Sequence, residues 1–152
     1  MTASTVVSGG ITSGAGISPD KITKVIGIVK AYTTRVGEGP FPTELFNKEG
    51  ELLRKEGKEV GTTTGRSRRC GWLDLELVRF ARQLNGIKEL AITKLDVLDK
   101  FPKIKICTGY RLNGRRVFYE SGDARFLERV KPIYIEVKGW NKTICGIKRF
   151  KD

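Results

Sequence analysis

Apolar residues near the start of the chain recur with a helical spacing. They fall at positions i, i+3, i+4 and i+7, namely Ile22, Val25, Ile26 and Val29. This spacing places four apolar side chains on one face of a helix. Ser18 can cap such a helix, Pro19 stands at its first position and Asp20 lies in its first turn. The pattern therefore predicts a helix that begins after Ser18.

Glycine, proline and polar residues surround this segment. Residues 1–17 are rich in Gly, Ser and Thr, which is typical of a flexible tail or of a loop whose backbone amides approach a phosphate. No GK[ST] follows them, so they are not a Walker A motif. Residues 37–43 hold two glycines and two prolines and predict an irregular loop. Charged residues 44–60 predict a short exposed helix, and residues 61–69 predict a polar loop.

The second half of the chain alternates between helical and strand patterns. A helix is predicted from about Leu73 to Leu84, and Asn85 and Gly86 end it. The mainly apolar run from Ile87 to Thr93 predicts a strand covered on both faces by helices. A helix that leads into a buried strand indicates an α/β fold with layers and parallel strands.

The end of the chain predicts a β-hairpin and two further elements. The hairpin runs from Ile104 to Tyr119, and Asn113-Gly114 is a strong signal for its type I′ turn. Residues 124–130 predict a helical turn, and Pro132 to Val137 predict a strand.

Composition restricts the class of protein. The 152 residues fit one domain, and 39% hydrophobic with 30% charged residues is typical of a globular chain. Without a signal peptide or a long apolar run, we expect a cytoplasmic protein with no membrane partner. Cys70, Cys107 and Cys145 have no metal-site spacing and are expected to be reduced thiols. The sequence contains no histidine, which excludes Ser-His and Cys-His nucleophile pairs from this chain.

The net charge of +12 points to anionic partners. The basic residues are scattered, and aromatic residues do not interleave with them as a base-stacking surface for nucleic acid would require. Small phosphorylated or carboxylated molecules are therefore favoured over nucleic acid.

The tetrapeptide Thr93 to Asp96, TKLD, ends the apolar strand. Ligands of open α/β sheets bind beyond the carboxyl ends of the strands. The two oxygens of Asp96 match the N1–H and the exocyclic amine of guanine, whereas adenine lacks that pair of donors. Lys94 can lay its aliphatic stem over the base. The alternative is a solvated lysine beside a helix-capping aspartate.

The segment Gly61 to Arg69, GTTTGRSRR, combines three threonines with three arginines. Arginine binds carboxylates and phosphates through two parallel hydrogen bonds. Arg66, Arg68 and Arg69 would repel one another unless an anion lay among them, which favours an anion site over a solvated turn.

Several long segments, in this order, resemble the C-terminal half of adenylosuccinate synthetases. They are STVVSGGITSGAGISP, KAYTTRVGEGPFPTEL, GTTTGRSRRCGWLDL, AITKLDVLD, and ERVKPIY followed by GW. The resemblance implies that residues 1–152 are the C-terminal part of a single synthetase domain. It also implies a P-loop-NTPase-like α/β fold without its N-terminal strands, with a partial, mostly parallel layered sheet and the β-hairpin.

The resemblance implies a GTP-dependent ligation of L-aspartate to IMP in AMP biosynthesis, with Mg²⁺ as cofactor and a homodimer as the assembly. Its IMP contacts fall on Thr2, Val36 and Arg66. Its aspartate contacts fall on Thr62, Thr63, Thr64, Gly65, Arg66 and Arg68. Its GTP contacts fall on Arg68, Lys94, Leu95 and Asp96.

The family's GDEGKG phosphate loop, catalytic base, histidine and metal ligands have no counterpart in these residues. No catalytic or metal-binding residue is therefore expected in this chain, which would be inactive without a complementary N-terminal half. The alternative functions are a non-catalytic module that binds nucleotides or anions and, from the charge alone, a nucleic-acid-binding domain.

Overall fold

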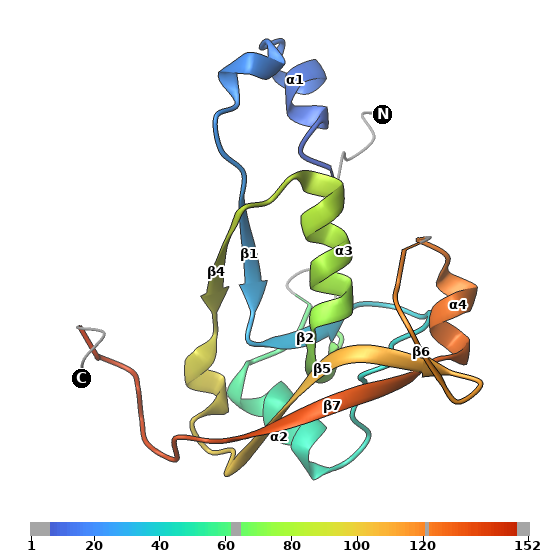
Figure 1. Ribbon diagram of the computed structural model, residues 1–152. Helices are drawn as coiled ribbons and strands as arrows, with labels where there is room; N and C mark the ends of the chain where they lie inside the picture. Colours follow the sequence, from blue (N-terminus) through green and yellow to red (C-terminus); the bar gives the residue numbers. More distant parts are fainter. Residues whose placement is uncertain (1–6, 62–64, 121, 149–152) are drawn as a thin grey trace.

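The computed structural model describes residues 7–61, 65–120 and 122–148, and Figure 1 shows their arrangement. The α-helices are α1 (Gly10–Ala15), α2 (Lys48–Glu56), α3 (Leu75–Asn85) and α4 (Ala124–Arg129). Two short 3-10 helices are η1 (Pro19–Lys21) and η2 (Leu95–Leu98). The strands are β1 (Ile26–Lys30), β2 (Tyr32–Arg35), β3 (Arg69–Asp74), β4 (Glu89–Thr93), β5 (Lys103–Leu112), β6 (Arg115–Val117) and β7 (Lys131–Lys138).

The described strands form two sheets. In the smaller sheet β1 pairs with β4 in parallel, and Lys30 lies opposite Thr93. In the larger sheet the order is β2-β3-β5-β6, and β7 also pairs with β5. The β3–β5 pairing is parallel, whereas β2–β3, β5–β6 and β5–β7 are antiparallel. The predicted α/β class is confirmed, and of the two described sheets the smaller is parallel and the larger is mixed.

The helix predicted after Ser18 is wrong. Only η1 is helical there, and Ile26 and Val29 of the predicted apolar face lie in β1. The segment from Ile22 to Val29 is dense in β-branched side chains, which lose rotamer freedom in a helix and pack well in a strand. Parallel pairing with β4 supplies the backbone hydrogen bonds, so tertiary contacts outweigh the helical spacing.

The glycine-rich start contains a helix that neither predicted alternative included. Residues Gly10–Ala15 form α1, and Gly16 ends it with a φ of 65°. The hydroxyls of Thr12 and Ser13 donate to the carbonyls of Gly9 and Gly10, which gives these two carbonyls hydrogen-bond partners within the short helix.

The predicted helix at Leu73–Leu84 is shifted, because a strand precedes it. Residues Arg69–Asp74 form β3, which the sequence pattern did not predict. Asp74 caps α3, accepting hydrogen bonds from the amides of Glu76 and Leu77. Gly86 ends the helix in the left-handed conformation, as predicted.

The predicted strand at Ile87–Thr93 forms as β4, but its predicted burial is wrong within this chain. All five residues of β4 are exposed, and Leu90 and Ile92 keep 44% and 52% of their surface exposed. Its partner β1 likewise exposes Ile26 and Ile28.

Several of the other predictions are confirmed. Asn113 and Gly114 have φ values of 51° and 80°, as a type I′ turn between β5 and β6 requires. Helix α4 and strand β7 form where expected, and residues 37–43 form no helix or strand. Helix α2 forms within residues 44–60, as predicted, but the prediction that it is exposed is wrong, because its Gly50 and Leu53 are buried.

Two apolar clusters form the core. The first surrounds Trp72, Tyr32 and Leu53, and the second surrounds Tyr110 and Leu127. All three cysteines are free thiols, and burial raises the pKa of Cys70 to about 11 and that of Cys107 to about 12. None of the helices in the described ranges has the length and apolar character needed to cross a membrane.

Candidate functional site

The carboxyl ends of β1 and β4 lie side by side, and the TKLD residues begin at the end of β4. The amide of Ala31 donates to the carbonyl of Thr93, over 2.9 Å. Lys94 adopts the left-handed conformation, with a φ of 60°, and turns the chain into η2. Asp96 lies in the first turn of η2 with its side chain exposed.

Lys94 contacts a distant part of the chain. Its Nζ donates to the carbonyl oxygen of Gly57 over 2.8 Å. Gly57 ends α2 and stands two residues before Glu59. The end of β4 is therefore tied to the segment that leads into the polar loop.

A hollow of about 300 Å³ lies beside Asp96. Its lining combines residues of α2, the η2 segment and the turn after β7, namely Glu56, Asp96, Asp99, Lys100, Asn141, Lys142 and Thr143. Asp99 is fixed in this wall, accepting hydrogen bonds from Trp140 Nε1 over 2.7 Å and from the amide of Ile144 over 3.2 Å.

Glu59 is the centre of a buried polar cluster, which we call the Glu59 cluster (Lys30, Tyr32, Glu59 and Arg68). Its side chain is 2% exposed. Its Oε1 accepts hydrogen bonds from the Tyr32 hydroxyl and from Lys30 Nζ, the latter over 2.8 Å. Its Oε2 accepts from Arg68 NH1 over 2.9 Å. One carboxylate thus joins β1, β2 and the end of the polar loop.

The cluster has an uneven balance of charge. Burial acts to raise the pKa of Glu59, but hydrogen bonds from Lys30, Tyr32 and Arg68 outweigh it and hold that pKa below its ordinary value. Burial and the neighbouring Glu59 carboxylate raise the pKa of Tyr32, so the phenol stays a donor. One carboxylate therefore faces two cations, and the cluster carries a surplus positive charge.

The polar loop starts and ends at a closed base. The Gly61 amide donates to the Arg66 carbonyl, and the Gly65 amide donates to the Gly61 carbonyl, each over 2.8 Å. Val60 and Ser67 form an isolated antiparallel bridge just outside this pair. Arg66 is exposed. Residues Thr62, Thr63 and Thr64 lie outside the described residues, as does Thr2.

Protein carboxylates bind two of the three loop arginines. Arg68 pairs with Glu59, and Arg69 pairs with Glu44 through Nε over 2.8 Å and through NH2. Mutual repulsion of these arginines is therefore balanced from within the fold. It does not by itself require a bound anion.

Arg69 also holds the loop that follows Val36. Its NH1 donates to the carbonyls of Gly37 and Gly39 over 3.1 and 2.9 Å. Val36 itself is 70% exposed. The structure thus places Val36, Arg68 and the loop base around one corner of the larger sheet.

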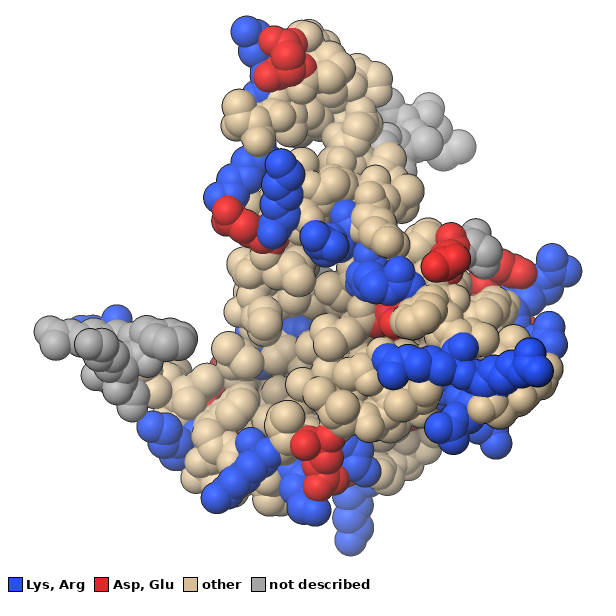
Figure 2. Space-filling view, in the orientation of Figure 1, with Lys and Arg blue, Asp and Glu red and all other residues tan. Residues whose placement is uncertain are grey.

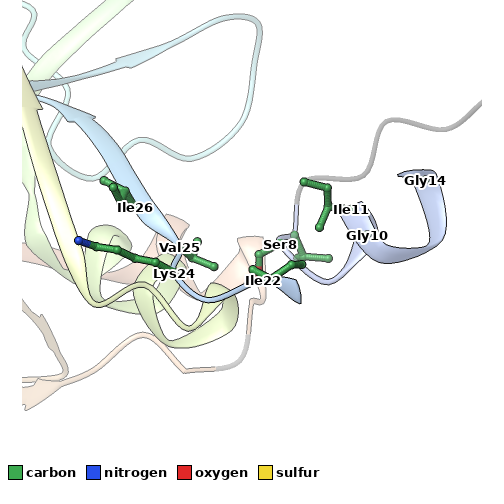
Figure 3. Close-up of a pocket in the computed structure, with 9 residues that line it drawn as sticks. Ser8, Gly10, Ile11, Gly14, Ile22, Lys24, Val25 and Ile26 are labelled. Carbon is green, nitrogen blue, oxygen red and sulfur yellow. The ribbon is translucent and has the colours of Figure 1, made fainter. Parts of the chain in front are cut away.

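Helix α1 lies at the amino end of β1, the opposite end from Lys30 (Figure 1). A hollow of about 680 Å³ lies there, between α1 and the start of β1. Figure 3 shows apolar side chains such as Ile11 and Ile22 in its lining. Its cation, Lys24, pairs with Glu89 over 2.6 Å. Residues 1–6 lie outside the described residues, and the phosphate-binding loop stays a prediction.

The described residues contain no group of three His, Cys, Asp or Glu side chains that could hold a metal ion. The described residues therefore offer no matching ligand set for the Mg²⁺ expected from the resemblance. Figure 2 shows basic side chains at several separate places on the visible face, interrupted by uncharged surface.

Sequence patterns did not identify Glu59, Lys30 or Tyr32 as site residues. Their contacts span 27 and 29 positions along the chain. One signal was present, because Glu59 is the single acidic residue between Glu56 and Asp74 in a segment rich in basic residues.

Comparison with known proteins places this arrangement in a family. The family model for adenylosuccinate synthetase matches residues 1–152. The adenylosuccinate synthetase of Thermoanaerobacter sp. (strain X514) is 53% identical over 152 residues, which are 100% of this chain and 36% of that protein. That of Desulfitobacterium hafniense (strain DSM 10664 / DCB-2) is 49% identical, with the same coverage.

A solved structure agrees with these sequences. It is that of fully ligated adenylosuccinate synthetase from Plasmodium falciparum, with a TM-score of 0.92 and 39% identity, covering 99% of this chain and 37% of that one. The chain therefore spans a little over a third of the length of the relatives it matches. The whole-chain match and the shared P-loop-type α/β fold together show that the chain belongs to the adenylosuccinate synthetase family.

Proposed function

We propose that these residues supply the aspartate, guanine and part of the IMP contacts of an enzyme that ligates L-aspartate to IMP at the expense of GTP. One observation carries this proposal. Lys94 of the proposed guanine site bonds to Gly57, and Glu59, two residues later, binds Arg68 of the proposed aspartate loop. Segments more than 25 residues apart thus meet at one place.

In the proposed reaction the γ-phosphoryl group of GTP moves to the 6-oxygen of IMP. The aspartate amine then attacks carbon 6, and phosphate leaves with that oxygen. The residues of this chain bind and orient the reactants. Asp96 pairs with the two donors of guanine, while Arg66 and Arg68 neutralise the aspartate carboxylates and the phosphates. Thr62, Thr63, Thr64 and Gly65 donate to aspartate, and Thr2 and Val36 meet IMP.

We propose that residues 1–152 work as the C-terminal part of one synthetase domain and do not turn over alone. Two observations support this. The chain spans 36% of the Thermoanaerobacter relative. The apolar residues of β4, such as Leu90 and Ile92, are exposed, which leaves surface for a complementary part of the enzyme to cover. The homodimer and the Mg²⁺ requirement belong to the same proposal.

A chimera tests the proposed function. In this chimera, residues 1–152 replace the matching 152 residues of the Thermoanaerobacter sp. synthetase. With GTP, IMP, aspartate and Mg²⁺ it should form adenylosuccinate, while the 152-residue chain alone should not. A folded but inactive chimera that still binds GTP would favour a non-catalytic binding module and contradict the proposal.

A further inference from the structure

Arg68 is held at the base of the polar loop by two separate bonds to one residue. Its amide donates to the carbonyl of Glu59 over 2.9 Å. Its NH1 donates to Glu59 Oε2, also over 2.9 Å. The side chain of Arg68 keeps 30% of its surface exposed, whereas that of Glu59 keeps 2%. Glu59 is thus buried behind an arginine that still reaches the surface.

The remaining contacts of Glu59 fix its carboxylate. Lys30 Nζ and the Tyr32 hydroxyl both bind Oε1, which leaves Oε2 directed to Arg68. Lys30 is itself held by Thr34 Oγ1 over 3.0 Å. A carboxylate bound by donors from β1 and β2 has little freedom to rotate, so the guanidinium that it binds is fixed as well.

Space around Glu59 is equally restricted. A Cβ atom on Gly57 would lie 2.3 Å from the Tyr32 hydroxyl oxygen and 3.1 Å from Glu59 Cγ. The chain therefore passes close behind the carboxylate, and the Glu59 side chain has no room to withdraw from Arg68 on that side.

We propose that Glu59 is a positioning residue for substrate binding, which acts by fixing the guanidinium of Arg68 toward the aspartate carboxylate. The inference rests on the proposed function, in which Arg68 contacts aspartate. Glu59 itself does not touch the substrate. Its contribution is to set the direction of Arg68 before aspartate binds, so that less ordering is needed on binding.

The chain contains a matched control for this inference. Glu76 is a buried glutamate with a 4% exposed side chain, and it pairs with the 29% exposed Arg79 over 2.9 Å. This pair has nearly the same burial and distance as Glu59 with Arg68, but it lies in α3 rather than at the loop. Loss of a buried Glu–Arg pair can therefore be separated from loss of loop positioning.

The test measures steady-state kinetics of the chimera with Glu59→Gln, Arg68→Leu, the double variant and Glu76→Gln. Glu59→Gln should raise the aspartate KM about tenfold, the effect of losing one charge-assisted hydrogen bond, and should change the IMP KM by less than about twofold. In the Arg68→Leu background, Glu59→Gln should add less than about twofold, because both changes remove the same interaction. Glu76→Gln should leave the aspartate KM unchanged.

The results that would contradict the role of Glu59 differ from those that would contradict the proposed function. If Arg68→Leu raises the aspartate KM but Glu59→Gln does not, or if the two effects multiply, Glu59 does not act through Arg68. Equal losses in Glu59→Gln and Glu76→Gln would show a purely structural role and also overturn the inference. If Arg68→Leu itself has no effect on aspartate, the proposed assignment of the loop fails.

A second variant covers the case in which Glu59→Gln does not fold. Glu59→Asp keeps the charge that Lys30 requires but draws the carboxylate back from Arg68 by one methylene group. It should raise the aspartate KM in the same direction, and an unchanged value would overturn the inference.

Discussion

Glu59 and Arg68 are joined through both their backbones and their side chains. Each of the two hydrogen bonds measures 2.9 Å. The bridge between Val60 and Ser67 continues this pairing by one residue on each segment, toward the loop. The loop that begins at Gly61 thus leaves and re-enters the fold at a single fixed point.

The Glu59 cluster should make stability depend on pH in a defined direction. The folded-state pKa of Glu59 is lowered, so its contribution is present above the ordinary glutamate pKa and is lost as pH falls through the folded value. Urea unfolding from pH 3 to 7, followed by the fluorescence of Trp72 and Trp140, should show this for the native chain against Glu59→Gln. The difference in unfolding free energy should shrink toward acid pH. A difference independent of pH would contradict the assigned contacts.

Gly57→Ala should destabilise the chain by about 1–3 kcal/mol, the range for overpacking a tight site. The new Cβ would lie 2.8 Å from the Leu53 carbonyl oxygen as well as against the Tyr32 hydroxyl. Gly14→Ala is the control, because Gly14 lies in α1 with nothing within 4 Å of its added Cβ. The urea midpoint should fall for Gly57→Ala, whereas that of Gly14→Ala should stay near the parent's value or rise. Equal midpoints would show that the Gly57 segment has room.

Arg66→Leu in the chimera should raise the aspartate KM about 10- to 100-fold and also lower kcat. The exposed guanidinium is proposed to bridge aspartate and IMP, and so it touches both the substrate and the developing charge. Arg66→Lys should rescue poorly, because the paired hydrogen bonds of the guanidinium are lost. Kinetics of Arg66→Leu equal to those of the parent would show that the loop is misassigned.

Local signals predicted local structure well. The turn at Asn113-Gly114 and the end of α3 at Gly86 depend on backbone conformations that few residues adopt readily. The residue types at these positions therefore indicate the structure. The helix prediction for the β1 segment is wrong because its partner β4 lies about 60 residues away in the sequence. Only pairing with β4 overrides the helical spacing. Strand β3 was missed because Gly71 lies at its centre, where the Thr43 carbonyl approaches too closely for any side chain.

The candidate site shows the same contrast between local sequence signals and contacts that join distant segments. Arg68, Lys94 and Asp96 lie in segments whose residue types indicate anion or base binding, and so the sequence pointed to them. Glu59 and Tyr32 lie 27 positions apart, and their contact forms only when the segment after α2 meets β2. The one signal for Glu59 in the sequence is that it is the single acidic residue between Glu56 and Asp74, and Tyr32 carries none.

The central claim of the proposed function is that Asp96 binds the guanine base of GTP. Asp96→Asn replaces one acceptor oxygen with a donor, which opposes the exocyclic 2-amine of guanine but can pair with the 2-oxygen of xanthine. Asp99→Asn is the control, because both Asp99 oxygens already accept bonds from Trp140 and Ile144.

The most direct measurement is the ratio of the KM values for GTP and XTP in the chimera, for the parent, Asp96→Asn and Asp99→Asn. In Asp96→Asn the GTP KM should rise about 30- to 150-fold while the XTP KM falls, and the IMP and aspartate constants should change little. Asp99→Asn should keep the parent's preference. A GTP-to-XTP preference that survives Asp96→Asn unchanged would contradict the guanine site and, with it, the central claim.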